Sequence, residues 1–200
     1  MTQVLKLPTR ELRVRASEPI SEEEFLQICR DHPDLQIERE PDGTILFMPP
    51  TAWISGNSES EFVTDLKLYA RQNGGKAPST STGYTLPDGS VRSADGSYIS
   101  KEKSDAIPRK EWRKFPRVVS DFVVEVRSPS DTLKSLQDKM VRVWLKNGVR
   151  LAWLIDLQHE TVTIYRPHRE PEVLNGFDRV LSGEEVLPGF EFEGRWLKFV

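Results

Sequence analysis

Residues 118–131 read VVSDFVVEVRSPSD, and this stretch carries the strongest fold signal in the chain. Its first ten residues are rich in β-branched side chains, which favours a β-strand. Side chains alternate along a strand, so Glu125 and Arg127 share one face while three apolar residues share the other. The apolar face must pack on a core. The other face becomes charged toward the C-terminal end of the strand, where α/β sheets commonly form their sites.

The elements around this strand are predicted from hydrophobic periodicity and turn residues. They are a loose charged arm over 1–18, a capping-box helix from Ser21 that ends by Pro33, a hairpin over 36–47, a helix over 57–72, a hairpin over 83–99 with an unbroken return strand over 91–99, a loop or short helix over 101–116, a helix from the 128–131 start signal to Asn147, strands over 151–156 and 161–165, and a tail with one further strand. This order predicts an α/β domain over 19–200, with a central mixed β-sheet flanked by helices.

Composition narrows the class of protein. The 200 residues are 37% hydrophobic and 30% charged, which is ordinary for a water-soluble globular domain. The apolar runs are too short to cross a membrane, and residues 1–15 lack the apolar core of a targeting peptide. Cys29 is the single cysteine, which excludes a disulfide scaffold and a cysteine zinc site and favours the cytoplasm.

The net charge of −3 bears on nucleic-acid binding. A protein that coats nucleic acid is usually basic, so a packaging role is disfavoured. An enzyme that contacts DNA only at a cleft can be acidic overall and still carry a local basic patch.

Two acids and a cation form the candidate site. Asp95 lies on the predicted return strand about thirty residues before Glu125, and Lys139 lies at the border of the apolar stripe of the following helix. Two carboxylates can hold Mg²⁺, which activates water and stabilises charge on phosphorus. Lys139 or Arg127 would neutralise the negative charge that develops on the phosphate in the transition state, and Gln137 would orient the attacking water. The pattern is typical of a metal-dependent phosphodiesterase.

Each of these residues also has a structural explanation. Asp95 and Gly96 would suit a turn or bulge without function. Glu125 and Arg127 would suit an exposed pair across neighbouring strands, and Lys139 would suit a solvated helix face.

Glu59 falls within the buried stripe of the helix predicted over 57–72. An inward carboxylate is unusual, because burying it without a partner is costly. One interpretation makes Glu59 an additional acid of the site. The other places it in a fraying first turn, where the helix dipole favours an acid.

Several short stretches of the chain resemble the Uma-two family of endonucleases, which lies within the PD-(D/E)XK, restriction-endonuclease-like superfamily. The resemblance extends over about residues 37–199. The most specific stretches are DFVVEVRSPSD at 121–131 and LQDKM at 136–140, and they are joined by FMPPT at 47–51, STGY at 81–84, RSAD at 92–95, WLID at 153–156 and LPGF at 187–190.

The resemblance implies a restriction-endonuclease-like core with the N-terminal helix and β-hairpin as additions. It also implies Mg²⁺, with Mn²⁺ as a substitute, and DNA as substrate. The superfamily's aspartate corresponds to Asp95 and its glutamate to Glu125. Its lysine would stand at Arg127, so Lys139 resembles a migrated equivalent. An acid of the second helix corresponds to Ile54, which leaves Glu59 as a substitute.

Three hypotheses follow. The first is a Mg²⁺-dependent DNA endonuclease, for which a homodimer is plausible by analogy with enzymes that cut both strands. The second is a catalytically inactive DNA- or protein-binding module with the same fold, which Arg127 and the acidic charge keep open. The third is a structural partner, which no sequence feature supports.

Overall fold

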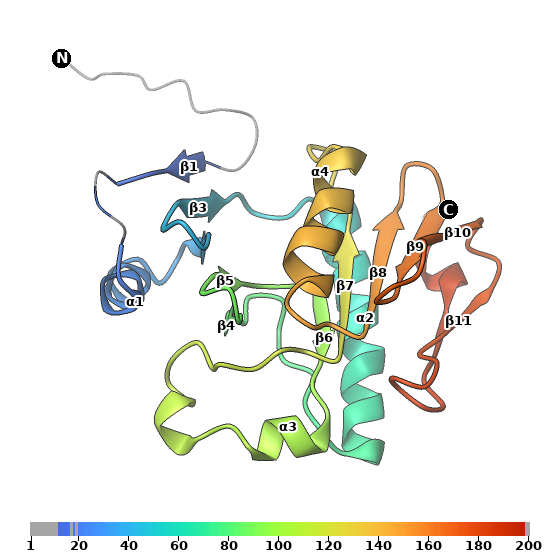
Figure 1. Ribbon diagram of the computed structural model, residues 1–200. Coiled ribbons are helices and arrows are strands. Elements are labelled where there is room, and N and C mark those ends of the chain that lie inside the picture. Colours follow the sequence, from blue (N-terminus) through green and yellow to red (C-terminus); the bar gives the residue numbers. More distant parts are fainter. Residues whose placement is uncertain (1–11, 17, 19, 199–200) are drawn as a thin grey trace.

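The computed structural model describes residues 12–16, 18 and 20–198. Its strands form two five-stranded sheets and a separate hairpin. The N-terminal sheet, at the left of Figure 1, is antiparallel throughout. Its strands in spatial order are β1 (Leu12–Val14), β3 (Ile45–Met48), β2 (Gln36–Arg39), β5 (Val91–Arg92) and β4 (Tyr84–Thr85).

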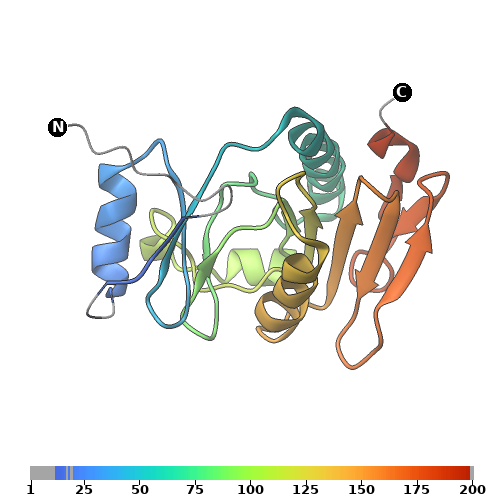
Figure 2. The same cartoon turned by 90° about the horizontal axis from the view of Figure 1, so that it is seen from above.

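The second sheet is the central mixed sheet that the sequence predicts. Its strands in spatial order are β10 (Glu172–Asn175), β9 (Thr161–Tyr165), β8 (Leu151–Asp156), β7 (Phe122–Val126) and β6 (Gly96–Tyr98). Only β7 and β8 run parallel within this sheet. Helix α2 (Trp53–Asn73) covers one face, and α4 (Leu133–Lys139) with the π-helix η2 (Met140–Leu145) covers the other (Figure 2).

Both faces of β7 are therefore buried. On the α2 side, the Phe122 ring meets Trp153 edge to face, with 4.8 Å between ring centroids. On the α4 side, Val123 belongs to a second core that includes Met140 and Trp144. All five residues of β7 are buried, Glu125 among them.

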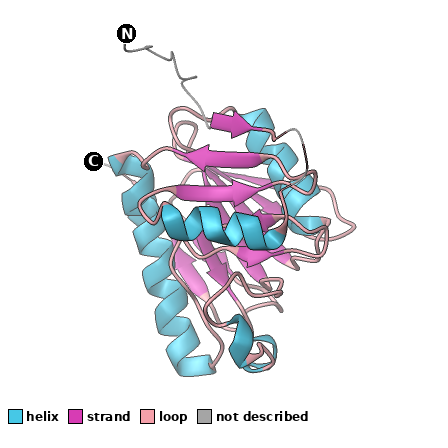
Figure 3. Ribbon diagram, turned by 90° about the vertical axis from the view of Figure 1, so that its left-hand side faces the viewer, coloured by secondary structure: helices cyan, strands magenta, loops and turns pink. Residues whose placement is uncertain are grey.

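Helix α1 (Glu22–Asp31) begins with the predicted capping box. The Ser21 hydroxyl accepts a hydrogen bond from Glu24 N at 3.2 Å, and a Glu24 carboxylate oxygen accepts from Ser21 N at 2.8 Å. The helix crosses the N-terminal sheet (Figure 3). Its buried Phe25 packs on Phe115, with 5.5 Å between ring centroids, and the helix ends before Pro33 as predicted.

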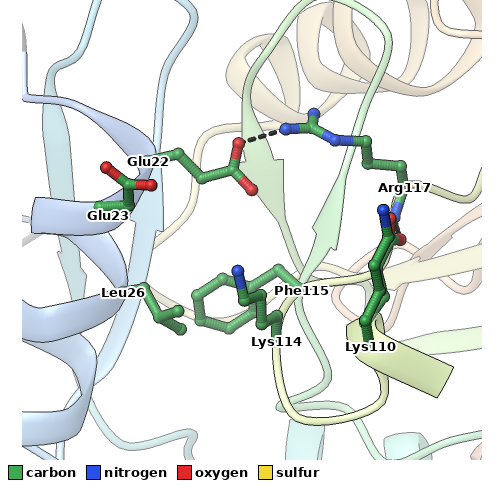
Figure 4. Close-up of a pocket in the computed structure, with 8 residues that line it drawn as sticks. Glu22, Glu23, Leu26, Lys110, Lys114, Phe115 and Arg117 are labelled. Atoms are coloured by element: carbon green, nitrogen blue, oxygen red, sulfur yellow. Dashed lines mark hydrogen bonds and ion pairs between the residues drawn. The ribbon is translucent and has the colours of Figure 1, made fainter. Parts of the chain in front are cut away.

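A cleft of about 390 Å³ lies between α1 and residues 110–117 (Figure 4). Leu26 and Phe115 supply its apolar wall, and Glu22 forms an ion pair with Arg117 across it. None of the predicted catalytic residues lines this cleft.

The predicted return strand over 91–99 is wrong in one respect. It is divided between the two sheets: β5 pairs with β2 through Arg39 and Val91, whereas β6 pairs with β7 through Gly96 and Val124. Residues 93–95 carry the chain from one sheet to the other. The two ends of the segment find different partners, so one continuous strand cannot satisfy both.

Other boundaries also differ from the predictions. Three residues of the predicted arm form β1, while residues 1–11 and 17 lie outside the described residues. Helix α2 starts at Trp53, four residues earlier than predicted. The tail forms three strands instead of one, because its apolar side chains pack on the α2 core; they are β10, β11 (Val180–Ser182) and β12 (Glu191–Glu193), followed by η3 (Gly194–Leu197).

The segment after β7 has a later helix start than predicted. The Ser128 hydroxyl and amide both bond to Asp131, and the helix begins only after Thr132, whose hydroxyl accepts from Ser135 N at 3.2 Å. The 101–116 segment contains the short α3 (Lys101–Asp105) and η1 (Arg109–Glu111), as predicted. Within the described residues, no helix combines the length and apolar character needed to cross a bilayer.

We predict that Phe122→Ala lowers the free energy of unfolding by about 3–5 kcal/mol, because it leaves a cavity against Trp153 at the centre of the α2 core. Urea denaturation followed by circular dichroism measures this loss. Val173→Ala is the control, because Val173 is 56% exposed on β10, and it should change stability by less than about 0.5 kcal/mol. Equal losses in the two variants would contradict the assignment of this core.

Candidate active site

Glu125 is the centre of the candidate site. It lies near the C-terminal end of β7 and is 2% exposed. Its Oε2 accepts a hydrogen bond from Lys139 Nζ at 2.9 Å, and its Oε1 accepts one from Trp144 Nε1 at 2.7 Å. The interpretation of Glu125 as an exposed cross-strand residue is therefore wrong. The helix that follows β7 covers the acid and supplies both of its partners.

The π-helix explains how two residues five apart reach one carboxylate. In an α-helix, Lys139 and Trp144 would diverge by about 140° at 100° per residue. A π turn closes its hydrogen bonds between residues five apart, which reduces the angle between such residues around the helix axis. The backbone bond from Lys146 N to Val141 O, at 3.1 Å, shows this spacing in η2. The wide turn places the ammonium and the indole N–H on the same side of the helix.

Asp95 lies beside Glu125, in the crossover between the sheets. Strand β6 pairs with β7 only as far as Val124. The next amide of β7 on the β6 side, at Val126, therefore has no backbone partner from β6. Asp95 supplies that partner, because its Oδ2 accepts from Val126 N at 2.7 Å. Across residues 12–16, 18 and 20–198, no hydrogen bond reaches Asp95 Oδ1. One carboxylate oxygen thus fixes the side chain and the other stays available.

Glu59 joins the two acids from α2. It lies in the second turn of the helix and is 9% exposed, so the fraying-first-turn interpretation is wrong. Burial and the negative charge of Glu125 raise its pKa, and the Thr51 side chain partly opposes the rise. Glu59 in turn contributes to raising the pKa of Asp95. Three carboxylates from three elements therefore share one electrostatic environment.

These carboxylates outnumber the cations that serve them. Burial raises the pKa of Asp95 to about 7 and that of Glu125 to about 8, and Lys139 offsets only part of each shift. Burial also opposes the charge of Lys139, but the carboxylates around it, Glu125 first, raise its pKa above the usual value. The lysine therefore stays protonated. Its single positive charge is smaller than the negative charge that the acids of the cluster carry when ionised.

Arg127 points elsewhere. Its Nη1 donates to Asp156 Oδ2 at 2.7 Å, and its Nε donates to Asp131 O at 3.3 Å. The imidazole of His159 shares the same Asp156 oxygen, at 2.9 Å. Arg127 thus ties the end of β7 to the end of β8, and no ion pair joins it to Glu125 in the part of the chain that the structure describes.

Gln137 is half-buried on α4. Its side chain makes no hydrogen bond to any described residue. It lies two positions before Lys139, which turns it about 200° away around the helix. Of the predicted residues, the structure thus brings together Asp95, Glu125, Lys139 and Glu59, but not Arg127 or Gln137.

Two residues near the acids escaped the sequence reasoning. Trp144 has the helical spacing of an apolar core residue, although a buried indole N–H usually requires a hydrogen-bond partner. Glu38 on β2 is 3% exposed and adds to the negative charge felt by Glu125 and Lys139. The sequence feature that could have revealed this burial is the unbroken apolar run from Ile45 to Met48 on the neighbouring strand β3. Such a run is typical of a strand covered on both faces.

The donor set suits a hard divalent cation. Carboxylate oxygens are the ligands that Mg²⁺ prefers, and the cluster lacks the positive charge that such an ion carries. Each Glu125 oxygen retains a second lone pair beside its hydrogen bond. The ligand set is not preassembled, because the described residues contain no group of three His, Cys, Asp or Glu side chains arranged to hold a metal. Asp95 and Glu125 fit the ion as a partial set.

Comparison with solved structures supports the fold. The chain resembles a structure described as a "putative nuclease belonging to DUF820" from Anabaena variabilis, with a TM-score of 0.67 and 23% identity over 81% of this chain and 91% of that one. A second match, to the DrdV–DNA complex, has a TM-score of 0.34 and 14% identity over 55% of this chain and 9% of that one, which is too weak to carry an argument. No curated protein matches the sequence.

The family comparison covers most of the chain. Residues 22–195 match the Uma2 family, described as "Putative restriction endonuclease". The match includes all the elements that carry the acids and Lys139, and it agrees with the mixed sheet flanked by helices. On this match, the chain belongs to the Uma2 family of restriction-endonuclease-like proteins.

Proposed function

We propose that this protein is a nuclease that hydrolyses DNA phosphodiester bonds with the help of a divalent metal, Mg²⁺ or Mn²⁺. The observation that carries the proposal is the buried Glu125–Lys139 pair beside Asp95, in a cluster that holds more acids than cations. Membership of the Uma2 family supports a nuclease over other uses of such a cluster.

The residues divide the work by their chemistry. Asp95 and Glu125 would hold the metal, with Glu59 as a third acid within electrostatic reach. When bound, the ion would supply Lewis acidity toward the phosphate and lower the pKa of water. Lys139 keeps its proton and can donate to a phosphate oxygen as negative charge develops on it. Arg127 would act indirectly, by fixing the strand end that carries Glu125.

DNA as the substrate rests on the family, since the chain itself is acidic. Binding would therefore depend on local cations and not on the net charge. A homodimer and a cytoplasmic location remain proposals of the same kind, because they rest on the way related enzymes cut both strands and on the single Cys29.

We predict metal-dependent nicking of supercoiled plasmid by the wild type. Glu125→Gln should lower the rate by about 100-fold or more, because it removes a metal ligand, and Lys139→Met should do the same, because it removes the charge at the phosphate. Lys134→Met is the matched control, because Lys134 lies on the same helix, is exposed and forms an ion pair with Asp138. Its rate should stay within about two-fold of the wild type.

Three outcomes distinguish the hypotheses. Nicking that survives EDTA, or that is equal in Glu125→Gln, would reject this site. Salt-dependent DNA binding without cleavage by either metal would favour the inactive binding module. Absence of both would favour a structural role.

The raised carboxyl pKa values predict a pH dependence of stability. Between about pH 4 and pH 8, Asp95 and Glu125 bind more protons in the folded state than in the unfolded state, since the pKa of Asp95 rises from 3.8 to about 7 and that of Glu125 from 4.5 to about 8. Stability should therefore fall as the pH rises through this window. Asp95→Asn keeps an acceptor for Val126 N and removes the charge, so its thermal midpoint should exceed that of the wild type more at pH 8 than at pH 5.

Mg²⁺ should raise the wild-type midpoint at pH 8 and leave that of Asp95→Asn nearly unchanged, because only the wild type retains the full ligand pair. Thermal unfolding followed by circular dichroism checks both effects. Asp138→Asn, on the exposed side of α4, is the control and should behave as the wild type. A wild-type midpoint independent of both pH and Mg²⁺ would contradict the charge excess.

A further inference from the structure

Glu38 links the N-terminal sheet to the segment that carries Asp95. Its carboxylate is almost fully buried on β2. Oε2 accepts from Arg92 Nη1 at 2.9 Å, and Oε1 accepts from the backbone N–H of Ser93 at 2.9 Å. Ser93 is the first residue of the crossover between β5 and β6, so Glu38 holds the crossover where it leaves the first sheet.

The other end of this crossover is held by β7. Asp95 stands two residues after Ser93, and its Oδ2 accepts from Val126 N at 2.7 Å. Two planar peptide units therefore separate the Glu38 anchor from the catalytic acid. A shift at Ser93 must be absorbed by this short stretch or passed on to the Asp95 side chain.

Stability does not account for the arrangement. A buried ion pair is on average no more stabilising than apolar residues of similar size. Arg92 is 7% exposed, and its Nε lacks a hydrogen-bond partner within the described chain. A buried donor without a partner is destabilising. Its other contact, from Nη2 to Glu40 Oε1, is long at 3.4 Å. A gain in stability therefore does not explain why the two charges are buried together.

We propose that Glu38 is a positioning residue of the nuclease site, which fixes the 93–95 crossover so that the Asp95 carboxylate meets β7 beside Glu125. This inference rests on the proposed function for its catalytic consequence, but its structural part stands on geometry alone. The electrostatic link between Glu38 and the site supports it, because the Glu38 charge contributes to raising the pKa of both Glu125 and Lys139.

Two neutral variants separate the effect of the length of the Glu38 side chain from the effect of its charge. Glu38→Gln keeps an acceptor at the distance of Ser93 N, whereas Glu38→Asn loses one methylene and cannot reach it. Glu40→Gln is the matched control, because Glu40 also contacts Arg92 but not Ser93. The first readout is hydrogen exchange of the Val126 amide, resolved by NMR without metal. The second is the kinetics of plasmid nicking, with kcat and KM determined separately.

In Glu38→Asn, exchange of the Val126 amide should accelerate by about ten-fold or more. Its kcat should fall by about 10- to 100-fold with KM within about two-fold, because a misplaced acid impairs chemistry more than binding. Glu38→Gln should recover most of both losses, and Glu40→Gln should match the wild type. A purely structural role would instead accelerate exchange throughout β7 and affect both Glu38 variants alike.

The double variant E38M/R92M guards against loss of folding, because it removes the buried charges together and leaves neither one unpaired. Urea denaturation should show cooperative unfolding, with stability lowered only as far as the Ser93 N–H loses its acceptor, while exchange protection of the Val126 amide and kcat stay low. Wild-type protection and kcat in this variant would overturn the proposal. If the wild type cleaves no DNA, the proposed function fails separately, and exchange at Val126 still decides whether Glu38 positions Asp95.

Discussion

The buried carboxylate of Glu125 is the constraint on which the rest of the structure depends. A charge at 2% exposure is tolerable only when its oxygens are satisfied, and the fold supplies the partners through its topology. Strands β7 and β8 are parallel, so a crossover must connect them, and α4 with η2 is that crossover. The helix that the parallel pairing requires is the same helix that brings Lys139 and Trp144 to the acid.

Satisfying Glu125 does not neutralise the site. Asp95 and Glu59 approach the same strand end from the crossover and from α2, and Lys139 is a cation that acts on both Glu125 and Asp95. The folded chain therefore holds like charges together at a cost in stability. The aromatic cluster on the other face of β7 offsets that cost, since Phe62 stacks on Phe192 and Phe122 packs on Trp153. Close packing on the α2 face of β7 thus supports the like-charged carboxylates near the C-terminal end of the same strand.

Local patterns predicted the parts of this design that local sequence determines. Strands β8 and β9, the capping box at Ser21, the inward Glu59 and the border position of Lys139 all follow from period and cap signals, and the structure confirms each placement. The division of the 91–99 segment between two sheets did not follow, because it depends on which distant strand each end meets. Burial of Glu38 escaped for the same reason, and no local sequence pattern marks the π turn that brings Trp144 to Glu125.

The N-terminal helix and strands β2 to β5 are connected to the candidate site through the 93–95 crossover. The family match begins at residue 22 and so includes them. Their sheet ends in β5, and the chain leaves β5 directly into the segment that carries Asp95. Strand β6 is only three residues long and begins at Gly96, immediately after Asp95. The second sheet alone therefore gives this acid a single hydrogen bond. In the proposed site Asp95 would hold a metal and would need to be fixed within a fraction of an ångström, and Glu38 in the first sheet is placed to provide a second support.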